Sequence, residues 1–209
     1  MVTLAEIGYS FFLMNGVFGF STLTAYLICT CFNQPFINPK YSEELITIRG
    51  KDAATTVCVV LVQGIAGSSP FMSRIWTTNH TWYESVSTMC MYSVLIEFMY
   101  YTYHRSVHSN SILYRIHKKH HMNYDVYPFD TFYLTTYDSM GLIVSLAVPL
   151  VFLRVTPFEL TCVLYMYLTS SYLSHSQLFY DHHHKHHTLL KCNFCFLFPI
   201  FDILCNTYQ

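Results

Sequence analysis

Long runs without a charged side chain limit most strongly how this chain can fold. Residues 7–32 contain no Asp, Glu, Lys or Arg, and residues 53–72 contain none either. Residues 85–103 form a third apolar stretch, in which Glu97 is the one charged side chain. An α-helix of about 20 mostly apolar residues crosses the hydrocarbon core of a bilayer. The sequence therefore predicts an all-α integral membrane helical bundle with about three spans.

A fourth apolar stretch, residues 141–172, is interrupted near its middle. It contains Arg154, Pro157 and Glu159. Proline is favourable in the first turn of a helix and disruptive inside one. We therefore expect two helices joined near residues 154–156. Each is short for a full crossing, so either two spans or a helical hairpin that enters and leaves on one side would satisfy the pattern.

The composition supports a membrane protein and argues against other classes. Charged residues make up only 11% of the chain, compared with about 25% in an ordinary soluble domain. The net charge of −1 and the lack of a basic stripe outside the histidine region give no reason to expect a nucleic-acid partner. The eight cysteines are scattered, most of them in apolar segments, so we expect free thiols rather than a disulfide framework.

The positions of the basic residues predict the orientation in the membrane. If the first three spans cross in turn, nine of the eleven Lys and Arg residues fall on one side: Lys40, Arg49, Lys51, Arg105, Arg115, Lys118, Lys119, Lys185 and Lys191. Such an excess marks the cytoplasmic side. The loop at residues 74–83, with the sequon Asn79-His80-Thr81, would then face the lumen, and His80 is not expected to bind metal. The first residues lack the basic region of a cleavable signal peptide, so we expect the first span to be a retained anchor.

Eleven of the twelve histidines lie between His104 and His187, in three main clusters. Residues three and four apart share one face of a helix, so each cluster is expected to aim two or three imidazoles in one direction. Imidazole is the commonest side-chain ligand for metal ions. The candidate ligands are His104, His108, His117, His120, His121, His183, His186 and His187. Because one ion takes four to six donors, two ions sharing this set is the simplest interpretation.

Several nearby residues have roles other than those of the eight candidate ligands, or alternative roles. His175 is either an interfacial histidine or a ninth ligand, whereas His182 and His184 are expected to lie around the ligands or to face solvent. Glu97 precedes His104 by two helical turns, so we predict that its carboxylate holds a ligand imidazole by a hydrogen bond. The alternative is a packing hydrogen bond to Tyr or Ser. The pair Cys192 and Cys195 resembles half of a zinc knuckle, but no second pair follows at a suitable spacing.

The three clusters resemble the signature of the fatty acid hydroxylase / sterol desaturase superfamily of integral membrane di-iron enzymes. That signature is His-x3-His, His-x2-His-His and His-x2-His-His, in this order. The similarity extends to the aromatic run before His104, to residues 113–118, to Asn193-Phe194 and to residues 201–207, and its context is most similar to sterol C4-methyl oxidases. It covers roughly residues 85–209, which leaves residues 1–84 as N-terminal membrane-anchoring helices.

The resemblance implies a chemistry and its partners. Two iron ions would use O2 to hydroxylate, desaturate or oxidatively demethylate a lipid, either a fatty acyl chain, a sphingolipid or a sterol. With no fused cytochrome b5 domain, electrons would come from a separate cytochrome b5 or similar donor with its reductase. The expected location is the endoplasmic reticulum membrane, with the histidine clusters forming a cytoplasmic di-metal cap.

One departure from the family pattern concerns the ligand set. Relatives carry a further His-Pro after the second cluster, about where Thr135 and Thr136 stand here. The chain would then have one donor fewer, or would take it from His175 or His182. Two rival interpretations follow: a catalytically silent lipid-binding or regulatory homologue, and a metal carrier. The carrier is disfavoured because the histidine clusters lie beyond the ends of the spans rather than at mid-bilayer.

Overall fold

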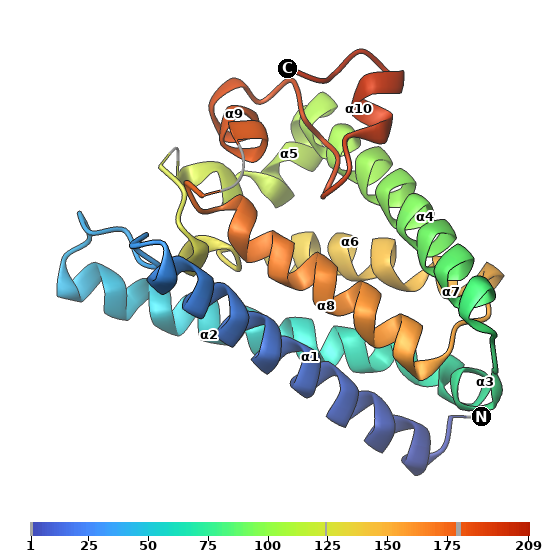
Figure 1. The fold of residues 1–209 in the computed structure, drawn as a ribbon. Helices are drawn as coiled ribbons and strands as arrows, with labels where there is room; N and C mark the ends of the chain where they lie inside the picture. Colours follow the sequence, from blue (N-terminus) through green and yellow to red (C-terminus); the bar gives the residue numbers. More distant parts are fainter. Residues whose placement is uncertain (1, 124, 179–180) are drawn as a thin grey trace.

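The computed structural model describes residues 2–123, 125–178 and 181–209, and the elements found in these ranges are all helical (Figure 1). In chain order they are α1 (Leu4–Cys31), α2 (Glu43–Ser68), the 3-10 helix η1 (Ser69–Phe71), α3 (Met72–Thr77), α4 (Trp82–Ser109), α5 (Ser111–His117), the 3-10 helices η2 (His120–Met122) and η3 (Pro128–Asp130), α6 (Thr136–Ala147), α7 (Pro149–Phe152), α8 (Pro157–Ser174), α9 (Asp181–Leu189) and α10 (Ile200–Leu204). The all-α prediction is confirmed.

The long helices run between two ends of the molecule. The short helices α5, α9 and α10 gather with the C-terminus at one end, and the N-terminus and α3 lie at the other (Figure 1). Helix α4 ends beneath this cap, and α8 leads into it. The histidine-bearing segments therefore form a cap on one end of a helical bundle.

Local sequence signals explain where the long helices begin. A capping box, in which a Thr side chain and a Glu three residues later satisfy each other's backbone N–H groups, starts α1 at Thr3, α4 at Thr81 and α8 at Thr156. Pro157 occupies the first turn of α8. The break between α7 and α8 falls at residues 153–156, as predicted from Arg154 and Pro157.

The bundle is held by an apolar core and by a few hydrogen bonds between helices. Thr22 on α1 lies 2.9 Å from the hydroxyl of Tyr172 on α8, and Thr24 lies 2.8 Å from that of Tyr165. On α4, the Tyr92 hydroxyl donates to the Leu146 carbonyl at 2.8 Å. Such polar contacts help to fix helix pairs in an apolar surrounding.

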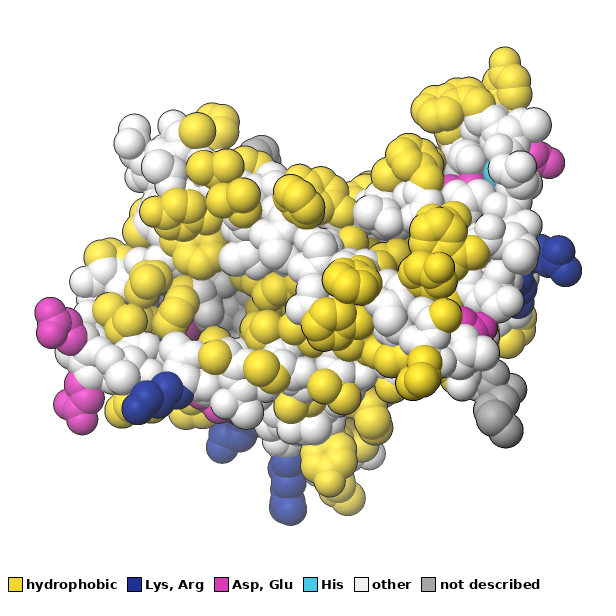
Figure 2. Space-filling model, turned by 90° about the horizontal axis from the view of Figure 1, so that it is seen from below, with side chains coloured by type: hydrophobic (Ala, Val, Ile, Leu, Met, Phe, Trp, Pro, Cys, Tyr) yellow, Lys and Arg dark blue, Asp and Glu magenta, His cyan; other side chains and the backbone are white. Residues whose placement is uncertain are grey.

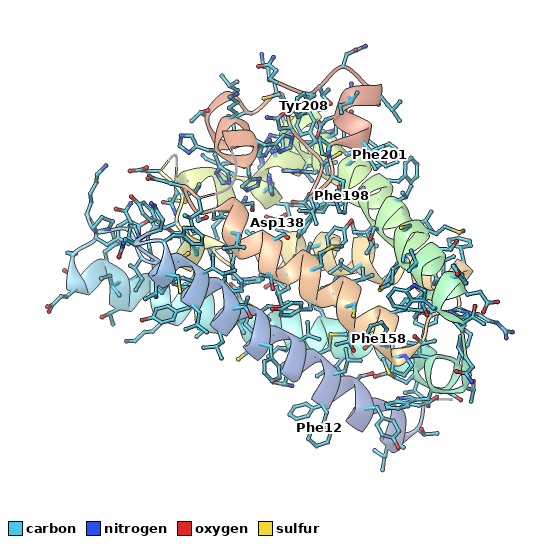
Figure 3. The ribbon with its side chains drawn as sticks, viewed as in Figure 1. Phe12, Asp138, Phe158, Phe198, Phe201 and Tyr208 are labelled. Atoms are coloured by element: carbon cyan, nitrogen blue, oxygen red, sulfur yellow. The ribbon has the colours of Figure 1, made fainter. Side chains whose placement is uncertain are left out.

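Two helical stretches of the described residues are long and apolar enough to cross a bilayer, Leu4–Cys31 and Glu43–Thr77. Helix α4, the expected third span, has 28 residues but is not one of them, because Glu97 and its serines and tyrosines make it less apolar. Seen from below, the molecule is mostly hydrophobic with its charged side chains near the edges (Figure 2). Phe12 is 75% exposed and points outward from α1 (Figure 3). This surface suits a membrane helical bundle.

Candidate metal centre

Nine histidines lie in two adjacent groups inside the cap. The five-histidine group contains His104, His108, His117, His121 and His186, and the four-histidine group contains His120, His175, His183 and His187. Within each group the potential ligand nitrogens all lie within 4.8 Å of one another. The structure thus brings together every predicted ligand, including His175.

The histidines of the second and third sequence clusters are divided between the two groups. The expectation that each cluster points in one direction is therefore wrong for these two. His117 and His121 face one group while His120 faces the other, and His186 is separated from His187 in the same way. On the α-helix α9, adjacent residues point about 100° apart, whereas residues four apart nearly coincide. The passage from α5 into η2 divides the second cluster in the same way. Each short segment can therefore supply ligands to two sites at once.

Burial lowers the pKa of most of these imidazoles. Seven of the nine are less than 8% exposed, and His183 is 8% exposed. Loss of water and the neighbouring histidines lower the pKa of His104, His120, His183, His186 and His187 well below the usual value. Burial also lowers the pKa of His175 to about 4 and, with His117 nearby, that of His108 to about 3. Neutral imidazole is the form that binds metal.

Hydrogen bonds on the outer side of the rings decide which nitrogen faces the centre of the five-histidine group. The Nδ1 atoms of His104 and His186 lie 2.8 Å from the carbonyl oxygens of Phe194 and Cys192. The Nδ1 of His117 lies 2.9 Å from a carboxylate oxygen of Asp138 (Figure 3). Because these oxygens only accept, each Nδ1 carries the proton and donates it. The Nε2 lone pairs of the neutral His104 and His186 therefore point inward, and the Nε2 of His117 faces the same way.

Too few protons are available for the inward contacts of this group to be hydrogen bonds. His104, His117, His121 and His186 form a row with Nε2 atoms 3.1, 3.0 and 3.1 Å apart. The two end nitrogens have no proton and each middle one has at most one, so at least one of the three contacts cannot be a hydrogen bond. The buried Nε2 of His108 has no hydrogen-bond partner. A cation would convert this repulsion into coordination, so these residues fit a metal ion.

The four-histidine group has the same shortage of protons. The Nδ1 of His175 donates to the Ser171 carbonyl at 2.8 Å, and that of His187 donates to the Asn123 carbonyl at 3.2 Å. The Nε2 of His183 faces both of their Nε2 atoms, at 3.2 and 3.1 Å. One proton on His183 can serve only one of these contacts. This group also fits a metal ion.

The spacing of the nitrogens suits first-row transition metals. Metal–imidazole bonds are about 2.0–2.1 Å long for zinc, and two such bonds at a right angle hold their nitrogens about 3 Å apart. The groups touch, since the ring centroids of His121 and His187 are 4.4 Å apart. The geometry is that of a paired site, and imidazole donors alone suit iron, zinc, copper and nickel.

Asp138 is a functional residue that the sequence analysis missed. It is 3% exposed, at the start of α6, and accepts from His117 as well as from the hydroxyl of Tyr103 at 2.6 Å. Tyr103 packs directly over Gly141, where an added Cβ would lie 2.2 Å from its ring, so only glycine leaves room for it. A carboxylate just before the fourth apolar stretch was the signal that could have identified Asp138.

Glu97 does not contact a histidine, so its predicted role is corrected. Its carboxylate accepts from the backbone N–H groups of Phe196, Leu197 and Phe198 at 2.8, 2.8 and 3.0 Å, and from the Tyr167 hydroxyl at 3.0 Å. Two helical turns separate Glu97 from His104 by about 10 Å, too far for one hydrogen bond. Residues 196–198 belong to the same loop as Phe194, whose carbonyl orients His104. Glu97 therefore positions the loop rather than the ligand.

Asp202 holds the same loop from its other side. It accepts from the backbone N–H groups of Phe194 and Cys195 at 2.8 and 2.7 Å. Asn193 has a φ of 57°, a left-handed conformation that asparagine tolerates, and its side chain donates to the His182 carbonyl at 2.9 Å. The motif residues near the C-terminus thus shape the carbonyls that orient the histidines.

The remaining candidate residues lie outside the two groups. His182 is 3.7 Å from Asp202 and stacks on Tyr208, and His184 is exposed. His80 pairs with Glu159 at 2.8 Å at the other end of the bundle. Cys192 and Cys195 are free thiols outside both groups, so the described residues form no zinc knuckle.

Comparison with known proteins supplies the family. The family model for fatty acid hydroxylases matches residues 89–207, more than half of the chain. The chain belongs to the fatty acid hydroxylase family. The match includes all nine grouped histidines and Asp138, and it begins within α4. No curated protein and no solved structure matches the chain.

Thr135 stands where some fatty acid hydroxylase relatives carry a histidine, and the structure shows what it does instead. The Thr135 side chain caps α6 by accepting from the N–H of Asp138 at 3.2 Å, and its hydroxyl donates to the Ile116 carbonyl at 2.8 Å. It does not face a histidine group. His175 is a member of the four-histidine group, whereas His182 is not.

Proposed function

We propose that this protein is a membrane-bound oxidoreductase that holds two iron ions in its histidine groups and uses O2 to oxidise a carbon of a lipid. The observation that carries the proposal is the pair of touching groups of buried, neutral imidazoles with unshared inward lone pairs. Family membership supports a hydroxylase-type reaction. Desaturation and oxidative demethylation need the same ligands, so the reaction is proposed only as oxidation of a lipid carbon.

Bound iron would supply the activation of O2 that breaks an unactivated C–H bond. For hydroxylation the balance is one lipid C–H, O2, two electrons and two protons, giving one C–OH and one water. The residues of this chain have simpler tasks. Four histidine rings are oriented by backbone carbonyls, those of Phe194, Cys192, Ser171 and Asn123. The ring of His117 is oriented by the carboxylate of Asp138.

The same proposal includes an electron donor and a membrane location. The two electrons would come from a cytochrome b5 or similar donor with its reductase. The protein would lie in the endoplasmic reticulum membrane with its cap on the cytoplasmic side. The apolar exposed surface and the two helices of spanning length support a membrane location.

Metal analysis tests the proposal. Protein purified in detergent under reducing, oxygen-free conditions should contain close to two irons per chain. Because His120 belongs only to the four-histidine group, His120→Ala should retain about one, with its helical circular dichroism unchanged. The exposed His184→Ala is the matched control and should retain both. Stoichiometric zinc that iron does not replace would contradict the oxygenase, and a single ion in the unaltered protein would contradict the paired site.

The silent homologue is the second candidate and needs a test of turnover. Lipids of cells that express the protein should change relative to cells without it. His108→Ala, His121→Ala and His187→Ala should each abolish the change, while His184→Ala should preserve it. If the ligand variants leave the lipids the same as the unaltered protein does, the catalytic proposal is wrong and a lipid-binding role replaces it.

A further inference from the structure

Three narrow cavities connect the histidine groups to the far end of the bundle. The first is lined by residues of both groups, among them His117, His120, His175 and His183. The second shares Phe132, Leu142, Ser171 and Phe196 with the first. The third shares Met14, Ile143, Leu146 and Leu164 with the second. Because neighbouring cavities share lining residues, the three lie in a row from the histidines to Leu160, and a ligand that occupied all of them would follow one path.

The path has the length of a lipid tail. Along α8 its walls run from His175, beside the metal groups, to Leu160 in the deepest cavity. Fifteen residues of α-helix span about 22 Å. One leaflet of a bilayer, half of a hydrocarbon core of about 30 Å, is about 15 Å deep. A long hydrocarbon chain can therefore lie fully within the path.

The path is too thin for a bulky ligand. The cavities measure about 40, 60 and 40 Å³ from the histidines inward, whereas pockets for drug-sized molecules usually enclose about 300–1,000 Å³. A slender chain in single file fits such a sequence of cavities, and a fused ring system does not.

The deep end offers no free hydrogen-bond donor to a head group. The Ser68 hydroxyl already donates to the Gly64 carbonyl at 2.8 Å, and the Tyr92 hydroxyl donates to the Leu146 carbonyl at 2.8 Å. The other residues that line this cavity are apolar apart from Gly64. By contrast, the cavity beside the histidines is also lined by Asp138, Thr131 and Ser174. The polar end of a ligand therefore belongs at the histidines, with its tail toward Leu160.

We propose that α1 and α2 form one wall of a single-file channel for an unbranched hydrocarbon chain, and that Gly64 and Met14 set the longest chain that fits. This inference rests on the proposed function only in taking the histidine end as the place of oxidation. Helices α1 and α2 lie outside the matched residues 89–207. They would thus determine substrate length in addition to any role as anchors.

Gly64 is the position where the width of the channel is most easily changed. It is buried on α2, and an added Cβ would lie 3.2 Å from the Met14 sulfur across the deepest cavity. Gly64→Leu should fill this end, and Met14→Ala should enlarge it. Gly19→Leu is the matched control, because Gly19 is exposed on α1 with nothing within 4 Å of an added Cβ.

The test uses saturated fatty acids of increasing length that carry a diazirine at the terminal carbon, irradiated with the full-length purified protein. Long probes should label peptides that contain Met14, Gly64 or Leu160. Gly64→Leu should weaken labelling by the longest probes about 10-fold or more relative to short ones, since one methylene in an apolar pocket discriminates about 10–200-fold. Met14→Ala should extend labelling to longer probes, and Gly19→Leu should change neither.

Labelling tests the channel and lipid oxidation tests the proposed function, so the failure of one proposal can be told from the failure of the other. Labelled α1 and α2 without oxidation of any lipid by the iron-loaded protein would support the channel and contradict the proposed function. Lipid oxidation without label on α1 and α2 would overturn the channel. So would label confined to the outer groove near Met89 and Met166, or displacement of the long probes by a sterol as efficiently as by an unlabelled fatty acid.

Discussion

Asp138 contacts one of the grouped histidines, His117, and also Tyr103, which lines the cavity beside them. Its carboxylate accepts from the Nδ1 of His117 and from the Tyr103 hydroxyl, and it is buried. A carboxylate in this position fixes the tautomer of a ligand imidazole and increases its basicity. Its effect on the metal is therefore exerted through His117.

Asp138→Asn should weaken metal binding without unfolding the protein. The amide oxygen can still accept from His117, but the negative charge is lost, and changes of this kind typically cost about 10–100-fold in metal affinity. Competition with a chelator at equilibrium measures the affinity. The control is Asp125→Asn, which removes an exposed ion pair with Lys40. An affinity unaffected by Asp138→Asn, or equally reduced by both changes, would contradict this role.

Buried neutral histidines make the metal-free protein sensitive to acid. Folding lowers the pKa of His175 to about 4 and that of His108 to about 3, because burial disfavours the charged rings, whereas in the unfolded chain each is close to 6.5. Between these values the unfolded state binds more protons, so the free energy of unfolding falls as the pH falls. The stabilisation is complete above about pH 6.5 and is lost progressively below it.

Thermal unfolding of the metal-free protein should therefore occur at a clearly lower temperature at pH 5.5 than at pH 7.5. His175→Gln, which removes one buried titrating ring, should reduce the dependence on pH, and the exposed His184→Ala should not. A transition temperature independent of pH in this range would show that the rings are not held neutral.

At the scale of elements, the loop at residues 192–198 is held between α4 and α10. Glu97 on α4 accepts from three consecutive N–H groups of the loop, and Asp202 on α10 accepts from two more. The loop in turn supplies the carbonyls of Cys192 and Phe194 to His186 and His104. The site therefore depends on two carboxylates that touch no ligand.

Glu97→Gln should destabilise the protein and loosen metal binding as a consequence. The amide retains one accepting oxygen but turns an N–H donor toward the donors of residues 196–198. Hydrogen bonds to charged groups contribute about 1.5–3 kcal/mol each, so we expect a clear drop in the transition temperature of the metal-free protein. Glu44→Gln, on the exposed start of α2, should have no such effect. Lower metal affinity with unchanged stability would indicate a direct role of Glu97 at the site.

The elements that could be predicted from the sequence are those encoded locally. Thr156, Pro157 and Glu159 lie within four residues and define the start of α8. The spacing of four residues places His104 with His108, His117 with His121, and His183 with His187. The contacts of Asp138 and Glu97 could not be predicted, since they join segments 21 and 99 residues apart. Backbone carbonyls, which orient His104, His175, His186 and His187, carry no signal in the sequence.

At the scale of the whole molecule, the two ends of the bundle differ in charge and content. Nine of the eleven basic residues lie in the turn between α1 and α2, in the first part of α2, at the end of α4 and in the cap. The opposite end holds α3 and the loop before α4, with the sequon at Asn79. An electron donor in the cytoplasm could reach the cap only if the cap faces the cytoplasm.

Epitope tags can be inserted after Lys40, in the turn between α1 and α2, and at Gln209. We expect both to be digested by protease added outside sealed microsomes. A tag beside Asn79, between α3 and α4, should resist digestion until detergent opens the membrane. The physical reason is the excess of basic residues on the first side, which favours retention in the cytoplasm. Digestion of all three tags after detergent is the control for access. A Gln209 tag protected in sealed vesicles would place the histidine cap in the lumen, and the proposed supply of electrons from a cytoplasmic donor would then be wrong.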